Sequence, residues 1–221
     1  MSSTLEEAES HLILFDCDGT LTDSHGAIVK AMQQAFVELD LPAPSDQAVN
    51  SVIGLSLEAA VSMLSTEHDD QDEIRERYRH YYLAEESSLA LYPGVIETLG
   101  ELIKRGYWMG IVTGKSKSGL LRVMQQFGLH DYFLVVRTAD CCPSKPHPAM
   151  AIECMDELGV NAARTTLVGD AVFDMQMAAS ANLRAFGVSF GVESTEVLTA
   201  EGAIDVVDDF PALLAYFPPL M

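Results

Sequence analysis

The sequence predicts an α/β fold, in which a mainly parallel sheet is flanked by helices and an all-helical domain is inserted after the first strand. Three observations support this prediction. Residues 12–15 are consecutive apolar residues, typical of a buried strand, and they end at an Asp-Cys-Asp-Gly turn. Apolar residues then recur at helical spacing, with no convincing strand over residues 24–90. From residue 93 onwards, helix-like and strand-like stretches alternate, as they do in βαβ units.

Each expected element follows from the local pattern of apolar residues. In the helical block we expect helices over residues 27–39, 56–64 and 71–85. In the alternating part we expect helices over residues 95–104, 117–127, 148–158 and 173–180. The strands of that part are expected over residues 109–112, 133–136, 165–168, 185–188 and 204–207. The predicted domains are therefore a sheet domain, residues 1–22 and 91–221, and a helical domain, residues 23–90.

Length and charge exclude several classes of protein. The chain has 221 residues, of which 48% are hydrophobic, so it can bury a substantial core. Its net charge is −20 with only 13 Lys and Arg residues, and these form no basic cluster suited to a nucleic acid. No apolar stretch reaches membrane-spanning length, and residues 1–10 lack the apolar core of a signal peptide. We therefore expect no nucleic acid or membrane partner.

Four cysteines, at positions 17, 141, 142 and 154, show no spacing typical of a disulfide scaffold. A reduced, cytoplasmic compartment is the prediction that follows. The adjacent residues Cys141 and Cys142 have two interpretations, an ordinary loop or a zinc or redox pair. We favour the loop, because adjacent cysteines rarely bridge or chelate together.

Two carboxylates stand at the end of the first strand. Side chains alternate across a strand, so Asp16 and Asp18 would share a face if the strand continued, with Cys17 opposite. Two like charges this close are unfavourable unless a cation or a shared proton lies between them. Taken alone, an acidic turn would be the simpler interpretation, since Asp-Gly is common in turns.

Three further motifs, in a fixed order, favour a chemical role for these carboxylates. Thr113 and Gly114 follow an apolar run. Lys145 lies in a Ser-Lys-Pro-His-Pro segment, whose prolines stiffen the loop. Asp170 follows another apolar run, and Asp174 lies one helical turn further on. Ligands of parallel sheets collect beyond the carboxyl ends of the strands, so we expect these groups to converge there.

The chain resembles the haloacid dehalogenase superfamily, in its phosphatase branch, through four ordered motifs: Asp-Cys-Asp-Gly-Thr-Leu-Thr (16–22), Val-Thr-Gly (112–114), Ser-Lys-Pro (144–146) and Gly-Asp-x-x-x-Asp (169–174). The resemblance extends from about residue 11 to the C-terminus. Two further segments, Ile-Gly-Leu (53–55) and Tyr-Pro-Gly-Val (92–95), are similar to the phosphoglycolate-phosphatase-like group. The resemblance implies a Rossmann-like three-layer core with an inserted helical cap.

The resemblance also implies a reaction and a cofactor. Asp16 would be the nucleophile and would form an aspartyl phosphate that water then hydrolyses. Asp18 would act first as general acid and then as general base. Asp16 and Asp170 would bind Mg²⁺ through their carboxylates, and Asp18 through its backbone carbonyl. Mg²⁺ suits a site whose proposed ligands are all oxygen atoms, and Lys145 would help to neutralise the charge of the phosphate.

The remaining motif residues have a functional and a structural interpretation each. Thr113 supplies a hydroxyl, and Gly114 allows close approach to the transferring phosphoryl oxygens, although Thr-Gly is also common in turns. Asp174 is expected to orient Lys145 or a water on the metal. Stabilisation of a helix N-terminus is the competing interpretation for Asp174, and both stay open.

The leading hypothesis is Mg²⁺-dependent hydrolysis of a small phosphorylated metabolite, such as phosphoglycolate or a sugar phosphate, with the helical domain as a lid. A phosphomutase that uses the same nucleophile and a non-catalytic binding module stay open. A dehalogenase is disfavoured, because its family pattern lacks the second acid, Asp18. A phosphonate hydrolase is also disfavoured, because it would need a cap lysine and Lys30 is the only lysine over residues 24–92. The oligomeric state is left open between monomer and homodimer.

Two positions depart from the family pattern. Ala181-Asn182 replaces the usual Ala-Gly, and the turn should survive, because Asn tolerates the left-handed conformation. Ala149 replaces an acidic residue, which should cost a helix-start interaction but not the chemistry.

Several other polar or turn residues are weaker candidates. Attraction of anions by Lys115 and Lys117 is left open, but we expect both to be solvated lysines at a helix start, and we expect His147 to be a loop residue. Contact of His25 or Gly54 with a substrate is left open.

Overall fold

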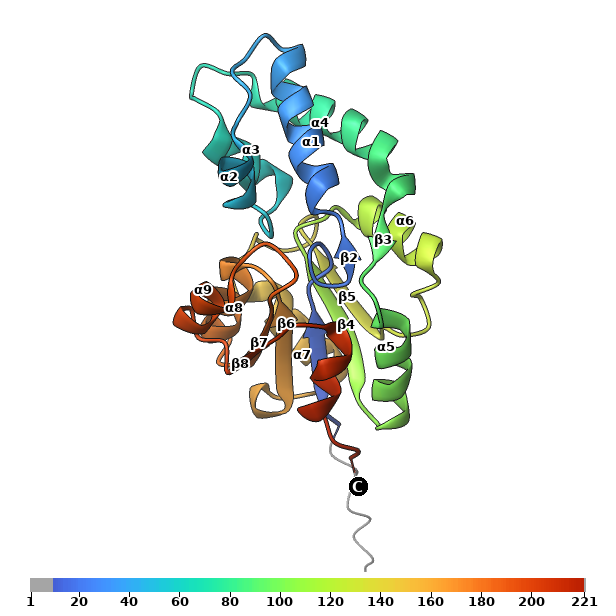
Figure 1. Cartoon of the computed structure of the whole chain (residues 1–221). Coiled ribbons are helices and arrows are strands. Elements are labelled where there is room, and N and C mark those ends of the chain that lie inside the picture. Colours follow the sequence, from blue (N-terminus) through green and yellow to red (C-terminus); the bar gives the residue numbers. More distant parts are fainter. Residues whose placement is uncertain (1–9, 221) are drawn as a thin grey trace, which may run out of the picture.

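A six-stranded parallel sheet forms the centre of the computed structural model, which describes residues 10–220 (Figure 1). The strand order is β5-β4-β1-β6-β7-β8, and every neighbouring pair is parallel. The strands are β1 (Leu12–Phe15), β4 (Trp108–Thr113), β5 (Val135–Thr138), β6 (Thr165–Gly169), β7 (Arg184–Val188) and β8 (Asp205–Val207). Because β1 lies between β4 and β6, the carboxyl ends of these three strands lie side by side.

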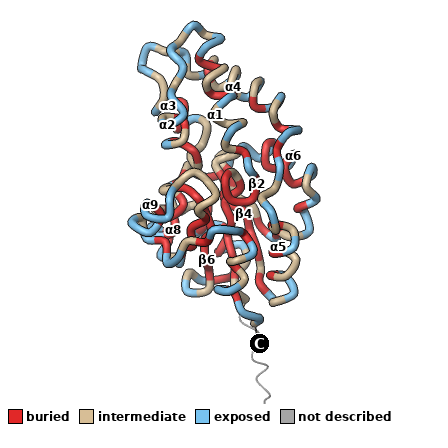
Figure 2. Tube along the Cα trace, viewed as in Figure 1, coloured by how far each residue is buried: buried red, intermediate tan, exposed pale blue. Residues whose placement is uncertain are grey.

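Helices cover both faces of the sheet. They are α5 (Val95–Lys104), α6 (Lys117–Phe127), α7 (Ala149–Leu158), α8 (Val172–Ser180) and α9 (Thr195–Ala200), with the 3₁₀ turns η2 (Ala162–Arg164) and η3 (Phe210–Ala215). On β1, Ile13 and Phe15 pack with residues of α5, α6 and η3. Leu12 and Leu14 pack with residues of α7 and α8 on the opposite face. The strand is therefore buried on both sides, which confirms the predicted α/β fold with three layers. Most residues of the neighbouring β4 and β6 are buried as well (Figure 2).

A block of helices follows β1 and lies beyond the carboxyl ends of the strands (Figure 1). It contains α1 (His25–Glu38), α2 (Asp46–Asn50), α3 (Leu57–Leu64), α4 (Gln71–Glu85) and the 3₁₀ turn η1 (Glu86–Ser88). A hydrophobic cluster of its own comprises the buried residues Met32, Phe36, Val49, Val61 and Ile74. Two short antiparallel strands, β2 (Thr22–Asp23) and β3 (Ala90–Leu91), bring its two ends together. We call residues 23–90 the helical insert.

Some details differ from the pattern of apolar residues. β5 covers residues 135–138 instead of 133–136, because its ladder with β4 begins where Val135 stands opposite Gly110, whereas Phe133 lies in the preceding loop. The sequence pattern does not predict α2, α9, β2 or β3, since such short elements depend on contacts distant in the sequence. The other expected elements lie within two residues of their bounds. The left-handed turn at Asn182 is confirmed, with a φ of 57°.

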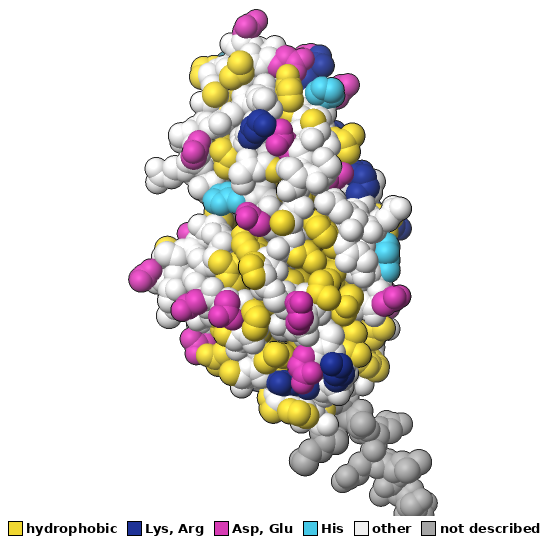
Figure 3. Space-filling view, turned by 45° about the vertical axis from the view of Figure 1, so that its right-hand side comes forward, with side chains coloured by type: hydrophobic (Ala, Val, Ile, Leu, Met, Phe, Trp, Pro, Cys, Tyr) yellow, Lys and Arg dark blue, Asp and Glu magenta, His cyan; other side chains and the backbone are white. Residues whose placement is uncertain are grey.

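Residues 1–9 and 221, which belong to the predicted sheet domain, lie outside the described residues. Within residues 10–220, no helix is both long enough and apolar enough to span a membrane. On the face of these residues that Figure 3 shows, acidic side chains are spread over both parts of the molecule, and Lys and Arg do not gather into one patch.

Candidate active site

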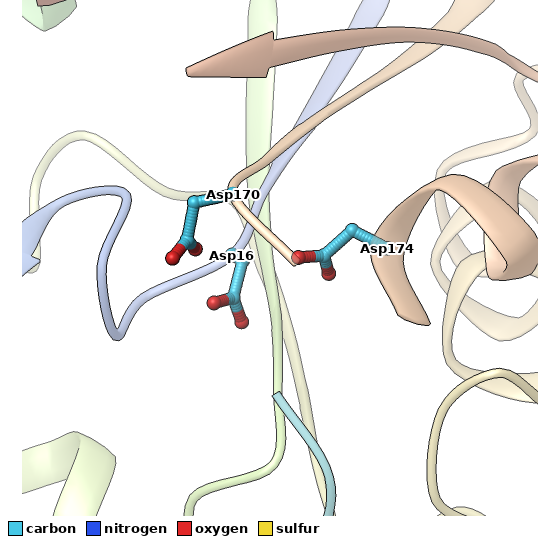
Figure 4. Close-up of side chains that lie close together, drawn as sticks. All are labelled: Asp16, Asp170 and Asp174. Carbon is cyan, nitrogen blue, oxygen red and sulfur yellow. The ribbon is translucent and has the colours of Figure 1, made fainter. Parts of the chain in front are cut away.

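The carboxyl ends of the three central strands each carry a buried polar residue. Asp16 directly follows β1, Thr113 is the last residue of β4, and Asp170 directly follows β6. Asp174 joins them from the first turn of α8. Figure 4 shows the side chains of Asp16, Asp170 and Asp174 gathered at this edge of the sheet. The structure thus brings together groups that are up to 158 residues apart in the sequence, from Asp16 to Asp174.

Three carboxylates form the centre of this site. One oxygen of each of Asp16, Asp170 and Asp174 lies within 4.8 Å of the others, and all three residues are buried. Burial raises the pKa of Asp16 to about 7, with Lys145 acting against this rise and Asp174 adding to it. Burial, and then the neighbouring Asp16 and Asp174, raise the pKa of Asp170 well above its usual value. The cluster therefore favours either a bound proton or a bound cation.

Lys145 supplies a positive charge within the cluster. Its Nζ donates to Asp16 Oδ1 at 2.5 Å and to Asp174 Oδ1 at 2.6 Å, and its side chain is fully buried. Burial alone would lower the pKa of this lysine, but the two carboxylates raise it above the usual value. Asp174 Oδ2 accepts a hydrogen bond from the Ala171 backbone N–H, so Asp174 both orients Lys145 and caps the start of α8. The two interpretations of Asp174 are therefore compatible.

Two hydrogen-bond donors hold the Asp170 carboxylate, and the backbone at two glycines packs closely against it. Thr20 Oγ1 donates to its Oδ1 at 2.9 Å, and the Val192 N–H donates to its Oδ2 at 2.9 Å. A Cβ atom at Gly19 would lie 2.0 Å from Asp170 Oδ2, and one at Gly191 would lie 2.4 Å from it. Gly19 also has a φ of +82°, a conformation that other residues rarely adopt. Both glycines are therefore required for the position of this carboxylate.

The cluster fits a divalent metal ion. Asp16 Oδ2 is buried and, among the described residues, has no hydrogen-bond partner. An unpaired buried carboxylate oxygen is costly unless a further group binds it. The nearby donor atoms are carboxylate oxygens, the ligands that hard cations prefer. The Asp triad could therefore hold such an ion.

Asp18 faces a different set of partners from Asp16. The strand ends before Asp18, and its Oδ1 accepts from Ser24 Oγ at 2.5 Å and lies 2.8 Å from Lys115 Nζ. Cys17 between the two acids is buried in the hydrophobic cluster on one face of the sheet. Asp18 itself is only partly buried, so it lies at the open side of the cluster.

Lys115 is a residue of the site that the sequence pattern did not reveal. Its side chain is 7% exposed, so the expectation of a solvated lysine is wrong for Lys115, whereas Lys117 is exposed as expected. The Lys115 Nζ also donates to the hydroxyl of Tyr82, on α4 of the helical insert, at 2.7 Å. Its position directly after the Thr113-Gly114 motif, at the carboxyl end of β4, is the signal that could have identified it.

The helical insert contacts the loops of the site through residues 54–56. The carbonyl oxygen of Leu55 lies so close to Gly114 that a Cβ there would be 2.1 Å away. The Ser56 N–H donates to Ser144 Oγ, beside Lys145, at 2.8 Å. Gly54, with a φ of +95°, lies over Ala171. This part of the insert therefore covers loops that carry three of the four motifs.

Three other sequence candidates, His25, the Cys141–Cys142 pair and His147, bond to residues outside this cluster. His25 Nε2 is 2.6 Å from Asn50 Oδ1, and both line a cavity of about 390 Å³ within the insert. Cys141 Sγ and Cys142 Sγ are 3.7 Å apart in the loop after β5, where the Cys141 thiol also donates a hydrogen bond to the carbonyl oxygen of Thr138. His147 is a loop residue, as expected, and its Nδ1 accepts from the Ala149 N–H.

Comparison with known proteins identifies the family. Residues 13–188 match the model of the haloacid dehalogenase-like hydrolases. A protein of Dickeya dadantii named "Probable phosphatase IndB" is 33% identical over 206 residues, which cover 90% of both chains. A phosphoglycolate phosphatase of Vibrio parahaemolyticus is 32% identical over 221 residues, which cover 95% of this chain and 97% of the other.

Solved structures show the same fold. A haloacid dehalogenase-like family hydrolase from Streptococcus pneumoniae superimposes with a TM-score of 0.83 at 26% identity, over 94% of this chain and 98% of the other. A hydrolase from Pseudomonas syringae has a TM-score of 0.85 at 24% identity, over 94% of this chain and 97% of that one. The chain therefore belongs to the haloacid dehalogenase-like hydrolases, in their phosphoglycolate-phosphatase-like group.

Proposed function

We propose that this protein is a Mg²⁺-dependent phosphatase of small phosphomonoesters that acts through an aspartyl phosphate on Asp16. The observation that carries the proposal is the difference between the surroundings of the two carboxylate oxygens of Asp16. One of its oxygens is held by Lys145, and the other is buried without a partner among the described residues. The matching relatives named as phosphatases support the same reaction class.

The attacking group in this proposal is Asp16. A carboxylate that approaches a phosphate dianion at ~4 Å meets a repulsion of several kcal/mol at an effective dielectric near 20. The ammonium group of Lys145, 2.5 Å from Asp16 Oδ1, offsets part of this repulsion. Attack breaks the bond between phosphorus and the ester oxygen and leaves the phosphoryl group on Asp16. Water then cleaves this acyl phosphate and restores the carboxylate.

Mg²⁺ would be held by the carboxylates of Asp16 and Asp170 and by the backbone carbonyl of Asp18. When bound, the ion supplies positive charge that offsets the repulsion between these carboxylates and the substrate. The fit is supported by the all-oxygen donor set and by the raised pKa values of Asp16 and Asp170, which are caused first by burial and then by the neighbouring carboxylates.

Proton transfer is assigned to Asp18. It would protonate the leaving alkoxide during attack on phosphorus and then take a proton from the hydrolytic water. Thr113 and Gly114 would bind the transferring oxygens. Thr113 Oγ1 already accepts from the Lys115 N–H at 3.2 Å, so its hydroxyl hydrogen is available to donate.

The helical insert, residues 23–90, is proposed to be a cap that excludes water from the site and limits the substrate to small molecules. Its contacts with the loops at Gly114 and Ser144 support this role. Phosphoglycolate-like compounds and sugar phosphates are the substrates to be tested first. A cytoplasmic location belongs to the same proposal and is supported by four free cysteines.

The test is a panel of phosphorylated metabolites assayed for phosphate release with Mg²⁺, with the parent protein and Asp16→Asn. The parent should release phosphate and lose this activity on chelation, and the Asp16→Asn variant should be almost inactive. Persistent turnover by Asp16→Asn would overturn the covalent mechanism. An isomerised sugar phosphate with little free phosphate would favour a phosphomutase, and binding without turnover would favour a non-catalytic module.

A further inference from the structure

Two adjacent cysteines that have no part in the proposed reaction lie between β5 and Lys145, in residues 139–145, which we call the dithiol loop. Cys141 Sγ and Cys142 Sγ are 3.7 Å apart, close to van der Waals contact. Cys141 is exposed, whereas Cys142 is only 7% exposed and belongs to the hydrophobic cluster that includes residues of α7 and α8. Burial, and then its hydrogen bond to Cys141, raises the pKa of Cys142 to about 12. An oxidant in solution therefore meets the Cys141 thiol first.

The Cys141 thiol also holds the turn at the end of β5. It donates to the carbonyl oxygen of Thr138 at 3.2 Å, and the Thr138 N–H donates to its sulfur at 3.4 Å. The backbone N–H groups of Cys141 and Cys142 donate to the same carbonyl oxygen, at 3.1 and 3.3 Å. A bond from Cys141 Sγ to another sulfur replaces the thiol hydrogen and removes the first of these contacts. A modification of this thiol therefore acts directly on the turn.

The dithiol loop contacts two other parts of the candidate active site. The Ala139 N–H donates to the carbonyl oxygen of Lys115, in the loop after β4, at 3.1 Å. Ser144 Oγ accepts from the Ser56 N–H of the helical insert at 2.8 Å. The dithiol loop ends at Lys145, whose ammonium group lies within the carboxylate cluster. A change in the shape of this loop therefore reaches the position of Lys145 and a contact of the insert.

We propose that Cys141 and Cys142 are a redox-sensitive modification site, which low-molecular-weight disulfides such as oxidised glutathione convert to a disulfide between the two residues. The Cys141 thiolate attacks one sulfur of the oxidant, so a mixed disulfide forms and one thiolate leaves. The Cys142 sulfur then attacks the Cys141 sulfur and displaces the second thiolate. Two electrons pass from the pair to the oxidant, and the two cysteine protons end on the released thiols. The second step is intramolecular between sulfur atoms already in contact, which offsets the raised pKa of Cys142.

This disulfide would change the shape of the dithiol loop. It brings the two sulfur atoms from 3.7 Å to about 2.0 Å. Adjacent Cα atoms are about 3.8 Å apart, less than the roughly 4.4–6.8 Å of most disulfides, so the backbone must move to accommodate the bond. A strained disulfide is easily reduced, which suits a reversible modification in a reducing compartment. We therefore expect oxidation to weaken the contacts of Ala139 and Ser144 and to displace Lys145.

The first measurement counts alkylated cysteines by mass spectrometry, after treatment with oxidised glutathione and alkylation of the denatured protein. The chain has four cysteines, so the parent should change from four alkylated cysteines to two, and dithiothreitol should restore all four. Cys142→Ser should instead keep a glutathione on Cys141, because the thiol for the second step is missing. Cys154, in the same hydrophobic cluster, tests for a different pairing, and Cys154→Ala should form the disulfide as the parent does.

The second measurement follows the dithiol loop by amide hydrogen exchange. Exchange of the Ala139 and Ser56 N–H groups, which bond to the Lys115 carbonyl and to Ser144 Oγ, should become at least ~10-fold faster in the oxidised parent. The same treatment should leave exchange unchanged in Cys141→Ser. Under the proposed phosphatase function, phosphate release should also fall by about 10- to 100-fold on oxidation, because Lys145 is displaced.

Four alkylated cysteines in the treated parent, or a lasting glutathione adduct on it, would overturn the proposal. Absence of the disulfide in Cys154→Ala would assign the bond to another pair and would overturn it as well. A disulfide without faster exchange at Ala139 and Ser56 would contradict its effect on the dithiol loop. The alkylation and exchange measurements detect thiols and backbone amides, so they decide this inference even if phosphorylated metabolites release no phosphate.

Discussion

Two buried lysines, each paired with one of the acids after β1, differ in what holds them. Lys145 contacts Asp16 and Asp174, both in the sheet domain. Lys115 contacts Asp18 in the same domain, but its second partner is Tyr82, on the helical insert. The first pair is thus complete within the sheet domain, whereas the second depends on the position of the insert.

The largest effect is expected from Lys145→Met, which breaks the first pair. It leaves Asp16 and Asp174 buried without their cation, so the free energy of unfolding should fall by about 3–5 kcal/mol. Activity should fall at least ~10³-fold, since the charge beside the nucleophile is also lost. Urea unfolding and phosphate-release kinetics measure the two effects, with Lys117→Met as the control. Unchanged stability in Lys145→Met would show that the pair is not formed in solution.

Asp18→Asn removes the carboxylate charge that pairs with Lys115. Hydrolysis of an alkyl phosphate should slow by about 10²- to 10³-fold, because the leaving alkoxide is no longer protonated. The first step with p-nitrophenyl phosphate, measured as the pre-steady-state release of p-nitrophenol before the aspartyl phosphate is hydrolysed, should be affected far less, since its leaving group needs no proton. Affinity for Mg²⁺, measured by calorimetry, should stay close to that of the parent, because the proposed ligand at this position is a backbone carbonyl. An equal loss on both substrates in this first step, the transfer of the phosphoryl group to Asp16, would contradict the assignment of Asp18 as general acid.

The pH dependence of stability in the metal-free protein tests the pKa of Asp16, the acid that pairs with Lys145, in the folded state. Folding raises the pKa of Asp16 from 3.8 to about 7, so between these pH values the folded state binds a proton that the unfolded state has released. The contribution of Asp16 to the free energy of unfolding should therefore decrease as pH rises from 4 to 7, by up to about 1.4 kcal/mol per pH unit.

This contribution is isolated as the difference between the parent and Asp16→Asn, measured by urea unfolding with a chelator present. Added Mg²⁺ should reduce the slope of this difference, because the ion binds the ionised carboxylates. A difference that stays constant with pH would show that Asp16 keeps its ordinary pKa in the folded protein.

The smallest effect is expected from Tyr82→Phe, which removes the hydroxyl partner of Lys115 and keeps the ring. The free energy of unfolding should fall by about 0.5–1.5 kcal/mol. Tyr81→Phe is the matched control, because the hydroxyl of Tyr81 bonds to Glu38 on the surface of the insert itself. Urea unfolding measures both variants. An equal change in the free energy of unfolding in the two would argue against a stabilising contact of Lys115 with the insert.

Short-range sequence patterns predicted most of the fold because each long helix and buried strand has its own periodicity. α4 and α6 begin and end where the spacing of apolar residues indicates. β5 is the exception, since its start depends on register with β4, and Phe133 before it packs in the core without joining the ladder. Three of the four motifs could be located for a similar reason, because each lies where a strand ends and the chain must turn, whereas Lys145 lies in the loop between β5 and α7.

Lys115 shows where this reasoning fails. In the sequence it is a lysine before a helix, next to Ser116, and only its place directly after the Thr113-Gly114 motif distinguishes it from the exposed Lys117. Its burial depends on Asp18, 97 residues earlier, and on Tyr82 in the insert. Pairing between such distant groups leaves no trace in local periodicity.

The sequence by itself determined the α/β architecture, the place of the helical insert and the order of the acidic motifs, because these follow from hydrophobic periodicity and from residues at strand ends. Only the tertiary structure decided which lysine faces which carboxylate and which oxygen of Asp16 is left unpaired. The physical reason is that the pKa and the pairing of a buried charge depend on every group within a few ångströms, and those groups come from strands and helices far apart in the chain.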